Sequence, residues 1–345
     1  MDINFLIESV NNVDERVDME VFKELKKKKL VFIRRHPTLA LNILMYTPKA
    51  KFERKWTKEL LMARGLVVDD QGTIVARPVT KFFNDFEISG SLPPGPIEVY
   101  EKKDGSLVVM FFVNGEPIFT TKGNFCSGQA AKAAEIFKAK YEDLILDEDY
   151  TYCFEVIYPE NKIIVDYQDE EDIFLFAKIH TQTGREEDIS GLGFKTVTQF
   201  AAVSGTDQIE DLKNLDRKNE EGFVIKFENN LRVKVKFETY FKLHKAATGY
   251  SEQQIWTLLQ SGDEIPTKHL SPEQIEVIDT IKTDLLTKFE SKKCDLIKEY
   301  ENIKQDSNDK QEIIEKIKAS SHPGAIFCLD KGKNCDPIIW KILKP

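Results

Sequence analysis

The chain has 345 residues, of which 41% are hydrophobic and 31% are charged, and its formal net charge is −9. This composition excludes a disordered chain, a collagen-like chain and a small disulfide scaffold, and the length favours two packed units. No apolar run approaches the roughly 20 residues that a membrane span needs, and the acidic start does not have the pattern of a signal peptide. We therefore expect a soluble, cytoplasmic protein that does not bind a membrane.

The five cysteines are odd in number and scattered, and they form no C-x-x-C pair. The spacing of Cys328 and Cys335 fits no standard set of zinc ligands, so we expect reduced thiols rather than a zinc site.

The net negative charge argues against a protein that coats nucleic acid through its overall charge. Basic residues are nevertheless concentrated at 22–36, 49–64 and 226–245. Local basic patches on an acidic protein suit an enzyme that acts on a phosphate-bearing substrate in one cleft. Ordinary solvated surfaces are the alternative, especially for the first run.

The first 60 residues are predicted to be helical and mixed, and strands are predicted from Ala63 onward. A hairpin is expected at 66–76 around a turn at 69–72. Further strands are expected at 97–103, 106–113, 117–121, 152–158, 162–167, 173–179, 222–228 and 231–237, with a helix at 130–141. This pattern predicts an α+β, antiparallel-rich body.

The composition changes near residue 250. Ser271-Pro272-Glu273-Gln274 has the residues of a helix start, and a long amphipathic segment rich in lysine and glutamate follows it. Another helix is expected at 311–319. We therefore divide the chain into a domain at 1–245 and a smaller all-helical C-terminal domain at 246–345.

The segment Lys102-Lys103-Asp104-Gly105-Ser106 lies between two predicted strands. A lysine at the end of a strand, followed by a tight turn, presents its amine to the cleft that the sheet lines. Such an amine can act as a nucleophile when neighbouring cations or desolvation lower its pKa. Taken alone, the same letters would indicate a β-turn with surface lysines.

Other short motifs accompany this segment in a set order. They are Ala63-Arg64-Gly65, Arg77-Pro78 and Lys81-Phe82-Phe83-Asn84 upstream, and Thr121-Lys122-Gly123, Phe154-Glu155, Glu221-Gly222-Phe223-Val224-Ile225 and Val233-Lys234-Val235-Lys236 downstream. The set resembles the covalent nucleotidyltransferases, which include polynucleotide ligases and RNA capping enzymes. Within them it is most similar to the bacteriophage-type RNA ligase 1 group, over about residues 46–245. The resemblance implies a nucleotidyltransferase (ATP-grasp-like ligase) fold.

The resemblance also implies roles for individual residues. Lys102 would receive AMP, while Lys234 and Lys236 would complete the catalytic set by holding the α-phosphate and lowering the pKa of Lys102. Strand alternation places these last two lysines on one face. Contacts to ATP are expected from Arg64, Lys81, Asp104, Gly105, Lys122, Glu155, Glu221 and Tyr46, although core packing is the alternative for Tyr46. Glu155 and Glu221 are also expected to bind Mg²⁺ or Mn²⁺.

The expected activity is that of an ATP-dependent RNA ligase. It would join RNA 5′-phosphate and 3′-hydroxyl ends through a lysyl-AMP and an RNA-adenylate, in RNA repair with tRNA as one substrate, and it would act as a monomer. A DNA ligase, a GTP-using capping-type enzyme and a catalytically silent RNA-binding protein are the alternatives. The helical domain would either select the RNA or only support the catalytic body.

Overall fold

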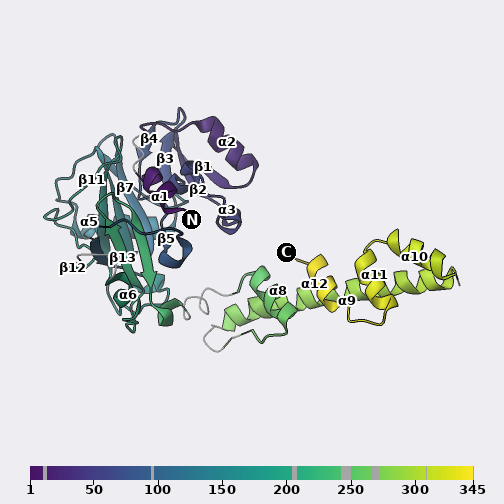
Figure 1. The fold of residues 1–345 in the computed structure, drawn as a ribbon. Helices are drawn as coiled ribbons and strands as arrows, with labels where there is room; N and C mark the ends of the chain where they lie inside the picture. The colour runs from purple at the N-terminus through teal and green to yellow at the C-terminus, as the bar shows by residue number, and fades with distance from the viewer. Residues whose placement is uncertain are drawn as a thin grey trace. The chain divides into compact units, whose positions relative to one another are not determined.

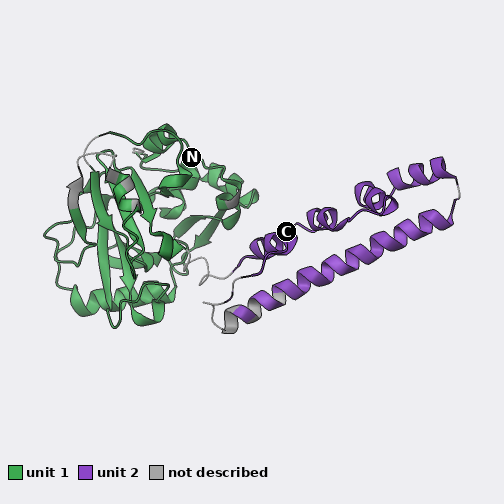
Figure 2. Ribbon diagram, turned by 60° about the horizontal axis from the view of Figure 1, so that its bottom comes forward, with its two compact units in different colours: residues 1–241 green, residues 242–345 purple. Residues whose placement is uncertain are grey.

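The computed structural model of the chain describes residues 1–10, 14–94, 97–203, 208–241, 250–265, 267, 272–307 and 309–344. These residues form two compact units, 1–241 and 242–345, which are described separately (Figures 1 and 2). The predicted domain boundary at 245/246 lies outside the described residues. Among the helices of the described part, none is both long and apolar enough to cross a membrane.

The first sheet of unit 1 has the strand order β1-β2-β3-β4 with antiparallel neighbours. Its strands are β1 (Val31–Arg35), β2 (Leu41–Tyr46), β3 (Arg64–Asp69) and β4 (Ile74–Ala76). Helices α2 (Met19–Lys27) and α4 (Lys58–Met62) pack an apolar cluster against one face. The predicted β3–β4 hairpin is present, whereas β1 and β2 are strands in a region that was expected to be helical and mixed.

The second sheet has the order β11-β10-β9-β7-β8, again antiparallel throughout. Its strands are β7 (Ser106–Val113), β8 (Glu116–Thr121), β9 (Tyr150–Ile157), β10 (Asp172–His180) and β11 (Glu186–Glu187). The β7–β8 turn is Asn114-Gly115, and both residues have the positive φ that a tight hairpin requires. Helix α5 (Gly128–Lys140) packs Ala133 and Ile136 against one face of this sheet.

The third sheet has the order β12-β6-β13-β14-β5, in which only the β14–β5 pair is parallel among the described pairings. Its strands are β5 (Phe83–Asn84), β6 (Ile97–Glu101), β12 (Gln199–Val203), β13 (Gly222–Phe227) and β14 (Arg232–Lys236). Helix α1 (Ile3–Val10) packs against one face, where Val233 and Val235 are buried. The unit also contains α3 (Pro48–Glu53), α6 (Gln208–Lys213) and the 3-10 turns η1 (Asp85–Glu87) and η2 (Pro159–Asn161).

The segment that carries the lysine motif connects two sheets. Strand β6 belongs to the third sheet and β7 to the second, so residues 102–105 cross from one to the other rather than forming a hairpin turn. Side chains on this crossing can therefore face a cleft between the two sheets.

The strand predicted at 162–167 is wrong, because this segment is a loop. The backbone N–H groups of Ile164 and Val165 donate to the carboxylate of Asp104, at 2.8 and 2.9 Å. These donors are thus satisfied by a side chain 60 residues away, and no neighbouring strand takes them.

Unit 2 is helical, with α8 (Glu252–Ser261), α9 (Pro272–Gln305), α10 (Lys310–Lys318), α11 (Pro323–Asp330) and α12 (Asp336–Ile342). The long α9 buries Ile278, Leu285, Phe289 and Leu296, whose spacing keeps them on one face. Phe289 stacks on Trp340 of α12 with ring centroids 4.5 Å apart. The predicted fold class, antiparallel α+β with a helical C-terminal region, is confirmed; Ser271, the predicted N-cap, lies outside the described residues.

Candidate active site

A cleft of about 550 Å³ opens where the second and third sheets face each other. Side chains from both sheets, from β3 and from the crossing segment line it: Arg64, Phe82, Tyr100, Glu101, Lys102, Lys103, Glu155, Phe176, Val197, Val224 and Arg232. Three residues that the sequence motifs single out, Arg64, Lys102 and Glu155, are therefore brought together.

Lys102 is held in the lining of this cleft by an ion pair with Glu221, the residue that precedes β13. Its Nζ donates to Oε2 of Glu221 at 2.8 Å, and Nζ of Lys236 lies 2.7 Å from Oε1 of the same carboxylate. The side chains of Lys102 and Glu221 are 19% and 4% exposed, so this is a largely desolvated triad. Gly222 positions it: the backbone N–H of Lys102 donates to its carbonyl, and an added Cβ there would lie 2.0 Å from the Val235 carbonyl oxygen.

The electrostatics of Lys102 differ from the expectation. Burial lowers its pKa, but the negative charges of Glu221 and Glu155 outweigh burial, so the pKa is raised. The expected lowering by neighbouring lysines is therefore not found; the Glu221 carboxylate intervenes between Lys102 and Lys236. Lys102 is protonated in this arrangement and must lose a proton before it can act as a nucleophile.

Lys234 carries the pKa perturbation that was expected for Lys102. Burial, together with the charges of Lys81, Lys102 and Lys236, lowers its pKa to about 6. Val233 and Val235 are buried in the core on the opposite side of β14, so Lys234 and Lys236 share the other face as the alternation predicts.

Two further cations lie close to this group. Burial lowers the pKa of Lys81 to about 8, with Arg64, Lys51 and Lys122 acting in the same direction. The pKa of Lys122 is lowered by burial and by the charges of Arg64 and Lys51. Desolvated cations that lie this close together repel one another, so they favour the binding of a polyanionic ligand.

Phe82 organises the cations at the cleft wall. The Arg64 guanidinium lies over its ring, 5.2 Å from the centroid, and the Lys234 amine lies over the same ring at 5.8 Å. Arg64 also donates to the Val79 carbonyl at 3.1 Å. Gly65 allows β3 to pack closely against the backbone of Lys122. Its φ is +95°, and an added Cβ would lie 2.9 Å from the Lys122 Cα.

Asp104 and Gly105 were expected to contact ATP, but the structure gives both of them supporting contacts. Asp104 is 4% exposed, and its carboxylate accepts from Tyr240 at 2.5 Å in addition to the two backbone donors of the 162–167 loop. Gly105 lies so close to β9 that an added Cβ would be 2.5 Å from the Val156 carbonyl oxygen. Together they fix the backbone on the C-terminal side of Lys102.

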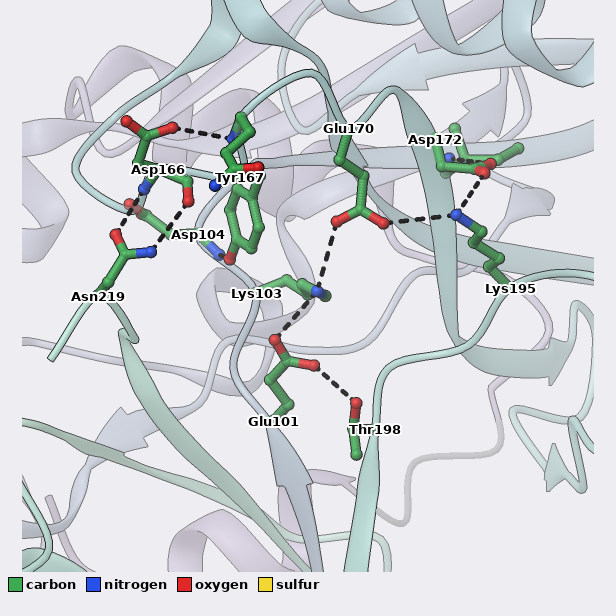
Figure 3. Close-up of polar contacts among 12 residues, drawn as sticks. Glu101, Lys103, Asp104, Asp166, Tyr167, Glu170, Asp172, Lys195, Thr198 and Asn219 are labelled. Atoms are coloured by element: carbon green, nitrogen blue, oxygen red, sulfur yellow. Dashed lines mark hydrogen bonds and ion pairs between the residues drawn. The ribbon is translucent and has the colours of Figure 1, made fainter. Parts of the chain in front are cut away.

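Lys103 belongs to a polar network that the motif analysis did not anticipate (Figure 3). Its amine lies 3.0 Å from Glu101 and 4.0 Å from Glu170, and it is placed over the rings of Tyr167 and Phe174 at 4.7 and 4.5 Å. Adjacent lysines in the motif thus have different surroundings, Lys102 facing Glu221 and Lys103 facing this network. Only the unusual density of acids at 169–172 could have suggested it from the sequence.

Within the described part of the chain, the Glu155 carboxylate is held by a backbone N–H and not by an ion pair. Its Oε1 accepts from the Gly105 N–H at 3.2 Å. Burial and the charge of Glu221 raise its pKa to about 7, although Lys102 and Arg64 act in the opposite direction. Within the described residues no group of three or more acidic, histidine or cysteine side chains forms a metal cage. Two carboxylates with water and phosphate oxygens as further ligands nevertheless suit Mg²⁺.

Tyr46 does not line the cleft. Its ring packs edge-on against Trp56 with centroids 5.1 Å apart, and burial raises its pKa. The core-packing alternative therefore describes its contacts better than stacking on adenine does.

Comparisons with known proteins show the family to which the chain belongs. The family model described as RNA ligase, of the T4 RNA ligase 1 type, matches residues 62–246, which is just over half of the chain. The chain is 26% identical over 257 residues to a candidate bifunctional polynucleotide kinase/RNA ligase of Autographa californica nuclear polyhedrosis virus, with 65% of this chain and 36% of that protein covered. It is 26% identical over 256 residues to a candidate RNA ligase of Thermovibrio ammonificans, with 66% and 64% covered.

The chain thus spans about a third of the viral relative and slightly under two thirds of the bacterial one. An RNA ligase of Rhodothermus phage RM378 is 20% identical, with 84% of this chain and 82% of that protein covered. Among solved structures, an archaeal ATP-dependent RNA ligase has a TM-score of 0.46 at 13% identity, covering 91% of this chain and 88% of its own. Structural similarity at that level is too low to support a functional conclusion. The family match does support one, and the chain belongs to the RNA ligase family of the T4 RNA ligase 1 type.

Proposed function

We propose that this protein is an ATP-dependent RNA ligase that works through a covalent AMP adduct on Lys102. The observation that carries the proposal is the position of Lys102, which lines a cleft together with Arg64 and Glu155, pairs with Glu221 and lies near the desolvated amine of Lys234. Family membership supplies the reaction class, and the cleft supplies a lysine that can carry it out.

In the first step the Lys102 nitrogen forms a bond to the α-phosphorus of ATP, while the bond to the bridging oxygen breaks and pyrophosphate leaves. Lys234, Arg64, Lys81 and Lys122 surround the region where the phosphates would lie, and we assign them to phosphate binding. A polyanion would relieve the mutual repulsion of these cations, so ATP binding is favoured by the charge that the fold concentrates here.

Glu221 keeps Lys102 protonated, and it is the acceptor closest to the proton that the amine must lose. Glu221 and Glu155 are the residues that we assign to a divalent ion, Mg²⁺ or Mn²⁺. When bound, such an ion would neutralise phosphate charge and weaken the hold of Glu221 on Lys102. Lys236 would retain its ion pair with Glu221 and keep that carboxylate in position.

In the second step AMP would move from Lys102 to an RNA 5′-phosphate, and in the third a 3′-hydroxyl would displace AMP and seal the strand. We place this activity in RNA repair, with a nicked tRNA as the first natural substrate to test, and we expect a monomer. Unit 2 carries lysines along α9, and we assign to it the selection of structured RNA.

The proposal is tested by supplying ATP, GTP and NAD separately, with Mg²⁺, to the protein and a 5′-phosphorylated RNA. Ligated RNA with ATP alone is the expected result. Sealing of nicked DNA in preference to RNA, or a label obtained only with GTP, would replace the proposal with a DNA ligase or a capping-type enzyme.

A further inference from the structure

A large aromatic side chain is exposed on the edge strand of the first sheet. Phe32 lies in β1 and is 57% exposed, whereas its neighbour Val31 is buried in the cluster beneath α2. Burial along β1 follows strand alternation, so Phe32 and Arg34 lie on the side of the strand opposite Val31. Single exposed apolar side chains are common on protein surfaces, so the neighbours of Phe32 decide whether it has a role.

The strand register links Phe32 to the cleft. Phe32 is paired with Met45 on β2, and Met45 is paired with Arg64 on β3. The register of β3 shifts at this pair, with Gly65 as the extra residue, and the three residues form a row across about 10 Å of the sheet. Met45 also contacts the Lys122–Gly123 turn, since an added Cβ on Gly123 would lie 3.0 Å from its sulfur. The row therefore ends at Arg64, on the wall of the Lys102 cleft.

Basic side chains surround the row. Arg34 is exposed two residues beyond Phe32 on the same side of β1. At the other end of β1, the Thr47 hydroxyl donates to the Lys29 carbonyl and Nζ of Lys49 donates to the Lys28 carbonyl, so the backbone of this lysine run lies beside the start of α3, where Lys49 also pairs with Glu53. Lys51 on that helix is close enough to lower the pKa values of Lys81 and Lys122, which are also lowered by Arg64 of the cleft wall.

We infer that Phe32 and Arg34 form a docking platform for single-stranded RNA next to the end that is sealed, with a base stacked on Phe32 and Arg34 on a neighbouring phosphate. An exposed aromatic ring flanked by cations is the arrangement that binds single strands without sequence preference. The inference rests on the proposed function, because it assumes that the substrate which reaches Lys102 is RNA.

Protection of an edge strand explains only part of this surface. Charged residues on an exposed edge discourage pairing with another chain, and Arg34 and Arg35 would serve that purpose. An exposed phenylalanine on the same strand, two residues before Arg34, has the opposite effect, since it makes the edge more apolar. Contact with a base accounts for the phenylalanine and the cations together.

The test measures RNA affinity without ATP, so it does not depend on AMP transfer. A short fluorescent 5′-phosphorylated oligoribonucleotide is titrated with the full-length protein carrying Phe32→Ala, Phe32→Leu or Phe32→Trp. We expect affinity about tenfold weaker for the alanine and leucine variants, and within about twofold of the original for tryptophan, which keeps a stacking surface. Ile145→Ala, which changes a fully exposed side chain on the α5–β9 loop, is the matched control and should leave affinity unchanged.

Two further readouts separate stacking from charge. Arg34→Ala should reduce the dependence of log Kd on log salt concentration by about one ion, whereas Phe32→Ala should leave that slope unchanged. Blunt duplex RNA offers no unstacked base, so Phe32→Ala should not weaken its binding. Thermal unfolding and AMP labelling of Lys102 should be the same in all of these variants.

Unchanged single-strand affinity for Phe32→Ala, in a protein that still forms its AMP adduct, would overturn the inference and leave the proposed function standing. Equal losses on single-stranded and duplex RNA would also overturn it. Absence of the AMP adduct from the original protein would instead count against the proposed function.

Discussion

Lys102 and Glu221 are 119 residues apart in the chain, yet the Lys102 amine donates to the Glu221 carboxylate at 2.8 Å. This ion pair joins the β6–β7 crossing to the start of β13 and holds the proposed nucleophile in its protonated form. In our account, catalysis therefore begins when the ion pair between Lys102 and Glu221 is weakened.

The first prediction concerns Glu221→Gln. Removing the carboxylate removes the main attraction that raises the pKa of Lys102, so burial should then dominate and the pKa should fall. The pH midpoint for labelling of Lys102 by acetic anhydride, followed by mass spectrometry, should shift downward. AMP transfer should nevertheless fall by about 100-fold or more, because a residue assigned to the metal ion is lost.

Glu101→Gln is the control for this experiment, since Glu101 pairs with Lys103 rather than with Lys102. Its labelling midpoint at Lys102 should match that of the original protein. An unchanged midpoint in Glu221→Gln would contradict the role given to this ion pair.

The second prediction contrasts the two lysines of β14. Lys234 has a pKa of about 6 in the folded protein, against an ordinary value of 10.5, so the unfolded chain binds its proton more tightly. Its contribution to stability is therefore unfavourable at neutral pH, and stability should rise with pH between these two values. Lys234→Met should raise the free energy of unfolding at pH 7 by about 2 kcal/mol, and this gain should vanish near pH 10.

Lys236→Met should have the opposite sign, because it removes one partner of the buried Glu221 carboxylate. We expect a loss of about 2 kcal/mol at pH 7. Urea unfolding of both variants across pH 6–10 measures these effects. If both substitutions lowered the free energy of unfolding to the same extent, Lys234 would not be a destabilising residue, and the prediction would be wrong.

The third prediction concerns Gly105. An added Cβ would lie 2.5 Å from both the Val156 carbonyl oxygen and the Ile157 Cδ1, so β9 or the Lys102 segment must move. Gly105→Ala should destabilise the protein by about 2 kcal/mol and greatly reduce AMP transfer. Gly128→Ala provides the comparison, because nothing lies within 4 Å of an added Cβ at this first residue of α5, and it should stabilise slightly. Thermal unfolding distinguishes the two.

The fourth prediction concerns Asp104. Asp104→Ala leaves the buried N–H of Val165 and the neighbouring N–H of Ile164 without their acceptor, and it should cost about 3 kcal/mol. Asp104→Asn can keep one oxygen toward these donors and turn its amide toward Tyr240, so a smaller loss is expected. If both variants bind ATP normally but the alanine variant transfers AMP slowly, Asp104 supports the nucleophile rather than contacting the nucleotide. Weakened ATP binding by a stable asparagine variant would restore the direct role.

The fifth prediction separates the two units. A protein ending near residue 249 retains the three sheets and the cleft, so it should still form the AMP adduct on Lys102. Sealing of a nicked tRNA should fall more than sealing of an unstructured oligoribonucleotide. Equal activity of the truncated and full-length proteins on both RNAs would limit unit 2 to a supporting role.

Local patterns were sufficient for most of the strands and for the helical region. The β3–β4 and β7–β8 hairpins have turn residues that act within a few positions, and α9 repeats its apolar residues on one face. Strands β1 and β2 were missed because exposed Arg34 and Arg35 and the preceding lysines hide the alternation. The loop at 162–167 is apolar and β-branched in sequence, and only its long-range contact with Asp104 shows why it does not join a sheet.

For the candidate site, too, the sequence predicted which residues matter but not the long-range contacts that they make. Motif order indicated which lysines and glutamates matter, and the fold brings Arg64, Lys102 and Glu155 to one cleft. The direction of the Lys102 pKa could not be predicted, because it depends on which carboxylate reaches the amine and how closely. Phe82 and Lys103 were named only as parts of motifs, since their contacts join segments that lie far apart in the sequence.

The most direct test of the central claim is peptide mapping of the AMP adduct. The purified protein, freed of bound AMP, is incubated with Mg²⁺ and ATP labelled at the α-phosphate, denatured, and digested. Our account predicts a label on Lys102 alone, and none in Lys102→Arg, which keeps the positive charge but provides a poor nucleophile. A label on a different residue, or no label with ATP, GTP or NAD, would contradict it.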